Sequence, residues 1–335
     1  MKRKLRILAL AGCAALALHA VMGSGAAQVA NPQVISSRIS SFPLAEGSPL
    51  TFVGGLKLTS EDGRFGGISG LRLSDNGSRI DMVTDEANWM TAEVQRNTGG
   101  AATGISNLRI KCLCKTDGTP YGGKHWGDSE ALEISGSTAY VGFERLNRIN
   151  AYDLGENRLP GKPRTISPPF KPLRIAYNEG LESIALAPKA SPVAGKFVAI
   201  AEHSPNASGD HRAFIVDQKN IREFSIKASD EFWVTDATFL ENGDLVILER
   251  RFGWSIGLDM RIRRFDGSKI APGATLDGEV LMQASLTDGI DNMEGISAWT
   301  NGRGQTVLSV ISDDNFKSFQ RTILLEFVLN EKGQS

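Results

Sequence analysis

Residues 291–329 read DNMEGISAWTNGRGQTVLSVISDDNFKSFQRTILLEFVL and contain one complete structural unit. Three apolar, β-branched runs are separated by two stretches of turn-forming residues, so we expect three antiparallel strands joined by two turns. Glu294 stands just before the apolar part of the first strand, the second strand ends in the acidic stretch 312–315, and Arg321 opens the third. This unit is a template for the rest of the chain.

The template recurs four times toward the N-terminus. Aligned on Glu294, the copies lie 52 to 61 residues apart and carry, in chain order, Ser69, Glu130, Glu182, Thr238 and Glu294. Each second strand ends in a charged step, at 85–86, 144–145, 202–203, 249–251 and 313–314. An arginine opens the third strand in four copies: Arg148, Arg212, Arg261 and Arg321. Repeats of this length are typical of four-stranded propeller blades with their loops.

The N-terminal part of the chain supplies a strand that the last copy lacks. Segments 107–114, 164–170, 221–228 and 279–286 each read as a fourth strand before the next copy, whereas no such strand follows Leu329. Leu50–Leu58 is strand-like and precedes the first copy, so we expect it to complete the last blade and close the ring, which removes exposed sheet edges. We therefore predict an all-β fold, a β-propeller of five four-stranded blades. Six blades is the alternative if residues 97–127 contain another unit.

The first 27 residues have the features of a secretory signal peptide. A basic start, MKRKLR, is followed by an apolar run and by small residues that suit cleavage after Ala26 or Ala27. We expect a mature propeller domain at 28–335, periplasmic or secreted, with no stable membrane span. The sequence around Cys13 resembles a bacterial lipobox, so a lipoprotein anchored at Cys13 is the alternative.

Charge and cysteine content narrow the possible functions. Without Lys2, Arg3, Lys4 and Arg6, 33 of the 37 basic side chains remain against 38 acidic ones. No basic face of the kind that binds nucleic acid is expected. Cys112 and Cys114 lie two apart in a predicted strand, and either a short disulfide or two free thiols is compatible with this spacing.

Several motifs at ordered positions resemble those of the phytase-like family, described as having esterase-like activity. They are GGISGL (66–71), DSEALEI (128–134), GFER (142–145), NEGLESIAL (178–186), LERRF (248–252), DNMEGISAW (291–299) and SDDNF (312–316) followed by QRT. The resemblance covers nearly all of the mature chain and implies a hydrolase of phosphate or other esters. A looser similarity is to calcium-activated nucleotidases, five-bladed propellers whose inner strands supply Ser and Glu oxygens to a calcium ion.

Residues at one repeat position of the innermost strands face one another around the propeller axis. Glu130, Glu182 and Glu294 would therefore converge, and like charges at short range raise one another's pKa unless a cation neutralises them. We expect these three carboxylates, helped by Ser69 and Thr238, to bind one Ca2+, which prefers oxygen ligands. The alternative is a hydrogen-bonded axle without metal, and a structural calcium without catalysis is a third possibility.

The ends of the second strands and the starts of the third strands should lie at the same face of the ring. We interpret Arg145, His203, Arg250 and Arg321 as binding a small anionic substrate, and Glu249, Asp313 and Asp314 as catalytic carboxylates. The alternative is that these charges form structural ion pairs within the blades. The sequence thus predicts a calcium-dependent hydrolase of phosphate or related esters. The alternative is a non-catalytic binding propeller with a structural calcium, and the substrate stays open.

Overall fold

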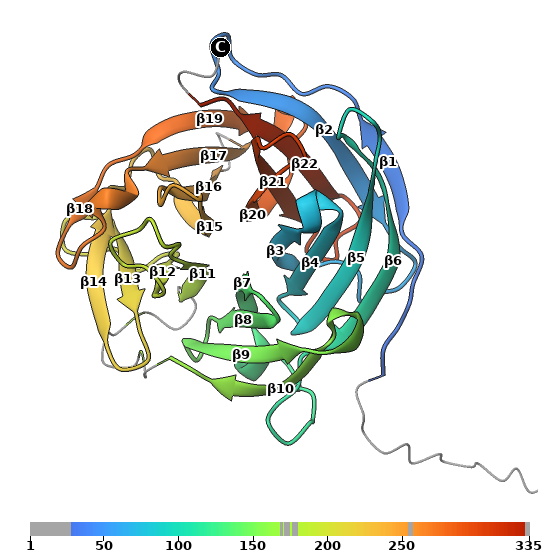
Figure 1. Ribbon diagram of the computed structural model, residues 1–335, viewed down its shortest axis with the longest axis horizontal. Helices are drawn as coiled ribbons and strands as arrows, with labels where there is room; N and C mark the ends of the chain where they lie inside the picture. The colour runs from blue at the N-terminus through green and yellow to red at the C-terminus, as the bar shows by residue number, and fades with distance from the viewer. Residues whose placement is uncertain (1–27, 168–169, 171–174, 176–179, 254–256, 332–335) are drawn as a thin grey trace, which may run out of the picture.

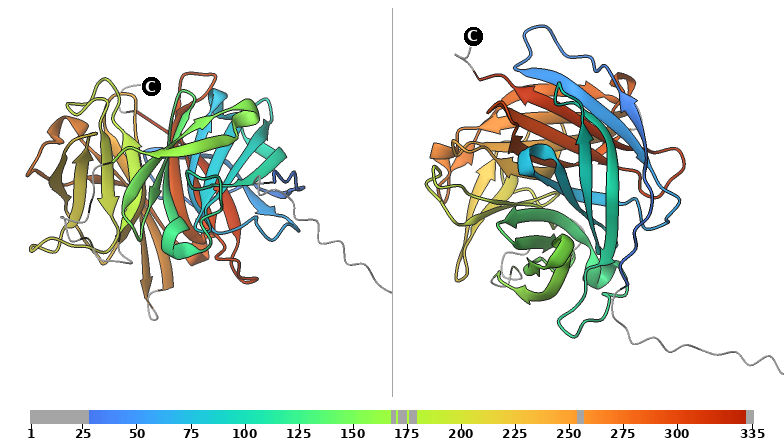
Figure 2. Two further views of the ribbon diagram at one scale, coloured as in Figure 1. Left: turned by 90° about the horizontal axis from the view of Figure 1, so that it is seen from below. Right: turned by 45° about the vertical axis from the view of Figure 1, so that its right-hand side comes forward.

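Five antiparallel sheets stand around a central axis in the computed structural model, which describes residues 28–167, 170, 175, 180–253 and 257–331 (Figure 1). Seen from the side, the strands run roughly along this axis and the sheets form a ring (Figure 2). The predicted signal peptide and Cys13 lie outside the described residues. No helix among the described residues is long and apolar enough to cross a membrane.

In blades 1 to 4 the innermost strand comes first in the chain order of the blade. Blade 1 comprises β3 (Ile68–Ser74), β4 (Arg79–Thr84), β5 (Asn88–Arg96) and β6 (Ala102–Cys112). Blade 2 comprises β7 (Ser129–Ser135), β8 (Thr138–Phe143), β9 (Arg148–Leu154) and β10 (Pro160–Thr165). Blade 3 comprises β11 (Leu181–Leu186), β12 (Phe197–Ala201), β13 (His211–Val216) and β14 (Ile221–Ile226).

Blades 4 and 5 complete the ring. Blade 4 comprises β15 (Trp233–Phe239), β16 (Leu245–Gly253), β17 (Gly257–Phe265) and β19 (Glu279–Ser285), and its short β18 (Thr275–Leu276) pairs with β14 of blade 3. Blade 5 comprises β20 (Asn292–Thr300), β21 (Thr306–Asp313), β22 (Thr322–Leu329), β2 (Leu50–Thr59) and β1 (Ile35–Ile39). Within the described ranges, the helical elements are α1 (Lys124–Gly127) and the 3-10 turns η1 (Asp75–Gly77), η2 (Glu156–Arg158), η4 (Gly267–Lys269) and η5 (Leu286–Asp288).

The N-terminal strand closes the ring, as the sequence predicts. β2 runs antiparallel to β22, from Leu50 opposite Leu329 to Leu58 opposite Thr322. The prediction of five blades is confirmed, and the six-bladed alternative is wrong because residues 97–127 contain the outer strand β6 and the short helix α1. The fourth strand of blade 2 begins earlier than expected, at Pro160, where an outer strand tolerates proline because one of its edges is unpaired.

The hydrophobic core lies between neighbouring blades. Leu71 of blade 1 belongs to the same buried cluster as Ile311 of blade 5, and Ala185 of blade 3 to the same cluster as Leu245 of blade 4. The inner strands approach one another closely: a Cβ atom at Gly295 would lie 2.7 Å from Leu71 Cδ2 and 3.3 Å from the Leu71 backbone nitrogen. This close packing leaves little apolar space at the axis, which is where the polar side chains meet.

Candidate metal and substrate pocket

Each inner strand contains a β-bulge near its beginning. The register against the second strand skips one residue in all five blades, for example between Ile68 and Gly70. A bulge leaves its extra residue unpaired and redirects the side chain. The bulged residues are Ser69, Glu130, Glu182, Thr235 and Glu294.

The sequence alignment was three residues out of register in blade 4. The structural equivalent of Glu294 there is Thr235, and Thr238 lies farther along β15, where it lines a different cavity together with Arg72 and Glu133. Thr238 Oγ1 accepts a hydrogen bond from the backbone nitrogen of Ala298 (3.3 Å). The prediction that Thr238 joins the acidic pocket is therefore wrong. Blade 4 has no glutamate at the bulge, so the sequence offered no anchor for the correct alignment.

The two bulge residues with hydroxyl groups, Ser69 and Thr235, make equivalent hydrogen bonds in different blades. Ser69 Oγ donates to the carbonyl oxygen of Ser129 (2.6 Å), the residue before the bulge of the next blade. Thr235 Oγ1 donates to the carbonyl of Met293 (3.2 Å), which holds the same position before the bulge of blade 5. These hydroxyls thus connect adjacent inner strands, whereas the three glutamates remain available to the axis.

A second set of polar residues lies on or just after the second strands, each directly after the residue that pairs with the one before the bulge. These positions hold Asp85, Glu144, Glu202, Arg250 and Asp313. Together with all the bulge residues except Thr235, they line a cavity of about 340 Å³ at one end of the axis. Its lining contains eight carboxylates (Asp85, Asp128, Glu130, Glu144, Glu182, Glu202, Glu294 and Asp313) and three cationic side chains (Lys124, Arg145 and Arg250), a formal excess of five negative charges.

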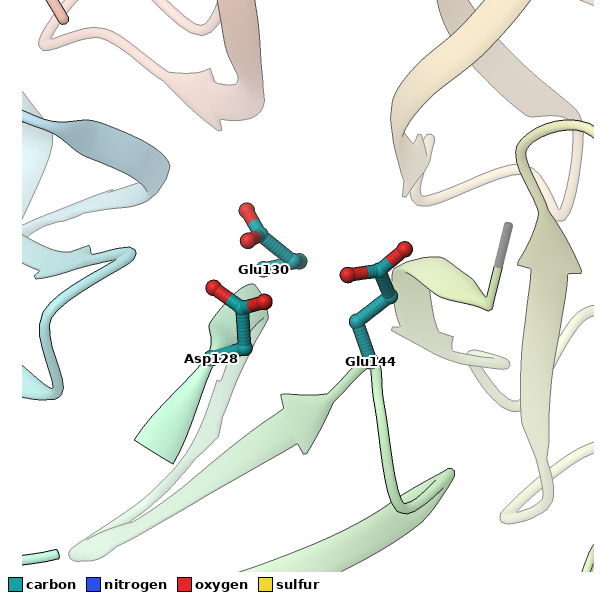
Figure 3. Close-up of side chains that lie close together, drawn as sticks. All are labelled: Asp128, Glu130 and Glu144. Atoms are coloured by element: carbon teal, nitrogen blue, oxygen red, sulfur yellow. The ribbon is translucent and has the colours of Figure 1, made fainter. Parts of the chain in front are cut away.

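Three of these carboxylates form a compact cluster. One oxygen each of Asp128, Glu130 and Glu144 lie within 4.8 Å of one another, and Figure 3 shows the side chains directed into the same space. Asp128 and Glu130 come from the start of β7, and Glu144 follows β8. Asp128 Oδ1 is buried and accepts no hydrogen bond, although Lys124 Nζ lies 3.9 Å away. A buried carboxylate oxygen without a donor fits a site for a cation.

Burial and mutual repulsion raise the pKa values of the pocket carboxylates. Withdrawal from water, and then the charge of Glu182, hold the pKa of Glu130 well above its ordinary value. Glu182 has a pKa raised in the same way by burial and by Glu202. Burial is also the main reason that the pKa rises to about 7 at Glu144, about 7 at Glu294 and about 8 at Asp313. A bound cation would lower these pKa values again, because it favours the ionised form of the carboxylates.

Blade 4 supplies an internal counterion instead of a fourth carboxylate. Arg250 Nη1 lies 2.9 Å from Glu294 Oε1, and Nη2 lies 3.2 Å from Glu202 Oε1, so it bridges the blades on either side. Arg250 also donates to Asn292 Oδ1. Arg250 thus offsets part of the negative charge of the pocket near blades 3, 4 and 5. Among the described residues, the cations at the Asp128, Glu130 and Glu144 cluster of blade 2 are Arg145, whose Nε donates to Asp128 Oδ2 (2.6 Å), and Lys124, whose Nζ lies 3.9 Å from Asp128 Oδ1.

The other end of the axis is closed by Arg72, a residue that sequence reasoning missed. Its guanidinium is buried and donates to the carbonyls of Leu71, Ile184, Ala237 and Ile296 at 2.7 to 3.1 Å. It also lies 3.2 Å from Asp236 Oδ2 and 3.5 Å from Glu133 Oε2. These partners belong to all five blades. No equivalent arginine occurs in the other copies, so the repeat gave no signal for it.

The remaining predicted site residues are divided between the pocket and the blades. Arg145, Arg250 and Asp313 line the cavity, whereas Glu249, Arg321, Asp314 and His203 are not among its lining residues. Glu249 is fully buried and is held by Arg261 Nε (2.7 Å) and Arg263 Nη1 (3.0 Å). It precedes the true equivalent of Glu144, which is Arg250, by one residue and therefore points to the other face of β16.

Arg321, Asp314 and His203 make contacts within the loops of the same face. Arg321 Nε donates to Asp291 Oδ2 (3.0 Å), and Asp314 accepts from Phe316 N (3.0 Å) and Thr322 Oγ1 (3.1 Å). The His203 ring stacks on Trp233 with ring centroids 3.4 Å apart. For Glu249 and Arg321, the structure has the ion pairs that the structural alternative describes.

The residues present fit a hard metal cation. The cluster offers carboxylate oxygens without histidine or cysteine, which suits calcium or magnesium better than zinc. Asp128, Glu130 and Glu144 can hold a metal ion, and Glu182 lines the same pocket. Asp85, Asp128 and Glu202 were absent from the predicted ligand set, although the charged steps and the DSEALEI motif contained them.

Three comparisons relate the chain to known proteins. A family model described as "Phytase-like: Esterase-like activity of phytase" matches residues 63–316. A search of curated proteins found no match. Among solved structures, an endo-arabinase from Bacteroides thetaiotaomicron is 10% identical with a TM-score of 0.48, over 81% of this chain and 96% of that one. PQQ-bound aldose sugar dehydrogenase from Streptomyces coelicolor is 12% identical with a TM-score of 0.42, over 89% and 100%. Similarity at this level carries no information about activity.

Proposed function

Because this chain belongs to the phytase-like family, we propose that it is a calcium-dependent hydrolase of phosphate esters or related esters. The observation that carries the proposal is the excess of carboxylates in a pocket that opens at one end of the axis, with Asp128, Glu130 and Glu144 within 4.8 Å of one another. Calcium is the ion that best suits six to eight oxygen ligands in a flexible ring. When bound, it would polarise an ester oxygen as a Lewis acid.

The side chains of the pocket divide into ligands and groups that act on the substrate. Asp128, Glu130 and Glu144 would hold the ion, with Glu182 beside them. Arg145 and Arg250 would orient an anionic ester oxygen, since guanidinium groups form paired hydrogen bonds with such oxygens. Asp313 accepts a hydrogen bond from Asn315 N (2.6 Å) and would accept a proton from the attacking water, because burial raises its pKa to about 8.

The pocket faces one side only, because Arg72 fills the axis behind it. Substrate and water therefore enter from the face that carries the loops after β8, β16 and β21. We also propose that the mature protein begins at residue 28 and acts outside the cytoplasm, in the periplasm or as a secreted protein, on the basis of the N-terminal pattern.

The test combines metal analysis with a substrate screen. Purified protein is assayed against phosphomonoesters, phosphodiesters, nucleotides, inositol phosphates and carboxyl esters, with calcium and with chelator. We expect calcium-dependent release of product and its loss in Asp313→Asn. Absence of turnover in every class at pH 5 to 9, with calcium shown to be bound, would disprove the hydrolase and retain the metal site.

One observation favours a second candidate, a non-catalytic binding propeller with a structural calcium. Each cation of the pocket already contacts a carboxylate: Lys124 with Asp85 (2.6 Å), Arg145 with Asp128 (2.6 Å) and Arg250 with Glu294 (2.9 Å). A pocket arranged in this way can be stable without substrate. Calcium-dependent stability without any hydrolysis is the result expected for this candidate.

A further inference from the structure

Exposed apolar side chains occur close in sequence to residues of the acidic pocket. In the described part of the chain, eight large hydrophobic side chains are exposed, and five of them lie in α1, at the end of β16 or in the loops after β8 and β21, which also supply pocket residues. We call these five the apolar ring: Trp126 (51% exposed), Leu146 (38%), Phe252 (65%), Phe316 (43%) and Phe319 (78%). Exposed apolar groups that gather at one place on a soluble protein usually mark a binding surface.

The chain order places the apolar ring at the mouth of the pocket. Trp126 belongs to α1, between the pocket residues Lys124 and Asp128, and Leu146 follows Arg145 directly. Phe252 comes two residues after Arg250, and Phe316 and Phe319 follow Asn315, which also lines the pocket. All five lie where a first strand begins or a second strand ends, so blades 2, 4 and 5 each contribute to the ring.

Phe316 connects the apolar ring to the carboxylates by direct packing. Its ring and the Asp85 carboxylate both lie against Gly67, where a Cβ atom would be 2.6 Å from Phe316 Cε2 and 2.5 Å from Asp85 Oδ1. Asp85 lines the pocket, and its Oδ1 is buried without a hydrogen-bond partner. The Phe316 ring therefore lies beside a carboxylate of the pocket.

The charge of the pocket disfavours a substrate with many negative charges. Eight carboxylates exceed three cations by five, and one divalent ion would leave a formal charge of about −3. Lys124, Arg145 and Arg250 are already bound to carboxylates. An inositol hexakisphosphate would add several more negative charges to a site that is still negative, whereas an ester with one negative charge or none meets little repulsion.

We propose, on the basis of the hydrolase function proposed above, that the substrate is an ester of low charge with an apolar group, held with its ester in the acidic pocket and its aryl or alkyl group against the apolar ring. Charge selects against polyanions, and the apolar ring selects for the hydrophobic part. Burying apolar area on binding strengthens affinity by about fourfold for each methylene group that leaves water.

The test compares ligands that differ only in their apolar part. Bis(2-phenylethyl) phosphate and diethyl phosphate each carry one negative charge and have similar leaving groups, and their kcat/KM values are measured with calcium beside inositol hexakisphosphate. The singly charged monomethyl esters of 2-phenylethyl- and ethylphosphonate are titrated by calorimetry, which reports binding separately from turnover. We expect the phenylethyl compounds to be preferred by about tenfold or more in both measurements, and inositol hexakisphosphate to be the poorest substrate.

Two variants of the apolar ring and one matched control test whether the preference for phenylethyl compounds comes from this ring. Phe316→Ser and Phe319→Ser should each reduce the ratio of the phenylethyl to the ethyl values about threefold or more. Val280→Ser removes an exposed apolar side chain (51% exposed) from the outer strand β19 and should not change this ratio. Thermal melting shows that each variant is folded before its preference is interpreted.

The possible outcomes separate this inference from the proposed function. A phenylethyl preference in binding without hydrolysis of any ester retains the apolar site and overturns the hydrolase. Hydrolysis without a phenylethyl preference, or with inositol hexakisphosphate as the best substrate, overturns the inference and leaves the hydrolase intact. No binding of either phosphonate, or a preference unchanged in both ring variants, also overturns it, and the ring would then contact another macromolecule.

Discussion

Arg250 lies 2.9 Å from Glu294 and 3.2 Å from Glu202, so one side chain of blade 4 neutralises charge on two neighbouring blades. The same position in the other four blades carries a carboxylate. The fivefold repeat is therefore broken in one blade, and the uncompensated negative charge is displaced toward Asp128, Glu130 and Glu144. A metal ion bound there would lie off the propeller axis.

Glu130→Gln and Glu294→Gln should differ in their effect on calcium binding. The amide keeps the shape of the side chain and removes its charge, so Glu130→Gln should abolish most of the rise in melting temperature that calcium gives the wild type. Glu294→Gln should keep more than half of it, because Arg250 already pairs with Glu294. Calcium at a hundredfold excess over Kd adds about 2.7 kcal/mol to the wild type.

Glu249→Gln is the matched control for these two variants, since Glu249 is a buried carboxylate outside the pocket. It should lower the melting temperature in the absence of calcium and leave the calcium-dependent rise unchanged. An equal calcium response in Glu130→Gln and Glu294→Gln would contradict an off-axis site.

Arg250→Met should destabilise the metal-free protein and make it more dependent on calcium. Removing the guanidinium leaves Glu202 and Glu294 without their cation, which costs on the order of 2 kcal/mol at neutral pH. Urea unfolding with chelator and with calcium measures this difference. If Arg250→Met loses the same stability in both conditions, the charge of Arg250 and the charge of the ion do not act on one pocket.

The stability of the metal-free protein should fall as pH rises from about 4 to about 8. The pKa is raised from 4.5 to about 7 at Glu294 and from 3.8 to about 8 at Asp313, so the folded state binds protons more tightly than the unfolded chain. The stability from these groups is fully present below the unfolded pKa and is lost as pH passes the folded pKa.

Melting temperatures in chelator across this pH range test the prediction. Calcium should flatten the curve, because the ion favours the ionised carboxylates. In Asp313→Asn the decline should be smaller. A melting temperature that rises steadily from pH 4 to pH 8 in chelator would show that the pocket carboxylates are not strained in the folded protein.

Arg72→Met should cost about 3–5 kcal/mol of unfolding free energy, because it leaves the fully buried Asp236 carboxylate without its cation. Arg79→Met breaks the exposed pair with Asp75 and should cost less than about 1 kcal/mol. If Arg72→Met does not fold, the Arg72→Met/Asp236→Asn pair should recover folding. Equal losses for Arg72→Met and Arg79→Met in urea unfolding would exclude the proposed role of Arg72 in joining the blades.

The fold was predictable because the strand pattern is repeated, so every copy supported the assignment of the others. Ser69, Glu130, Glu182 and Glu294 were found because their flanking residues are alike in each copy. The position of Thr235 could not be found, because a bulge shifts the side-chain alternation by one residue and Thr235 has no glutamate to mark it. The prediction places both Glu249 and Arg250 in the site, but adjacent residues of a strand point to opposite faces, so only Arg250 reaches the pocket.

Other parts of the site depend on contacts between distant segments. Arg72 binds carbonyl groups that are separated from it by more than a hundred residues, as at Ile184 and Ile296. The apolar ring consists of residues from four separate segments of blades 2, 4 and 5. Neither Arg72 nor the apolar ring has a local sequence motif, since the residues of each come together only when the five blades close into a propeller.

The pairing of β2 with β22 sets the order in which the protein can be completed. β2 leaves the ribosome long before its partner β22, because paired residues such as Leu50 and Leu329 lie near opposite ends of the chain. Until then the first blade has no closed neighbour, and the edge of β2 that later meets β22 is exposed to other chains. A nascent chain interrupted anywhere before Thr322 would therefore carry an open strand edge, and one interrupted before Asn292 would also lack the pocket residues that blade 5 provides.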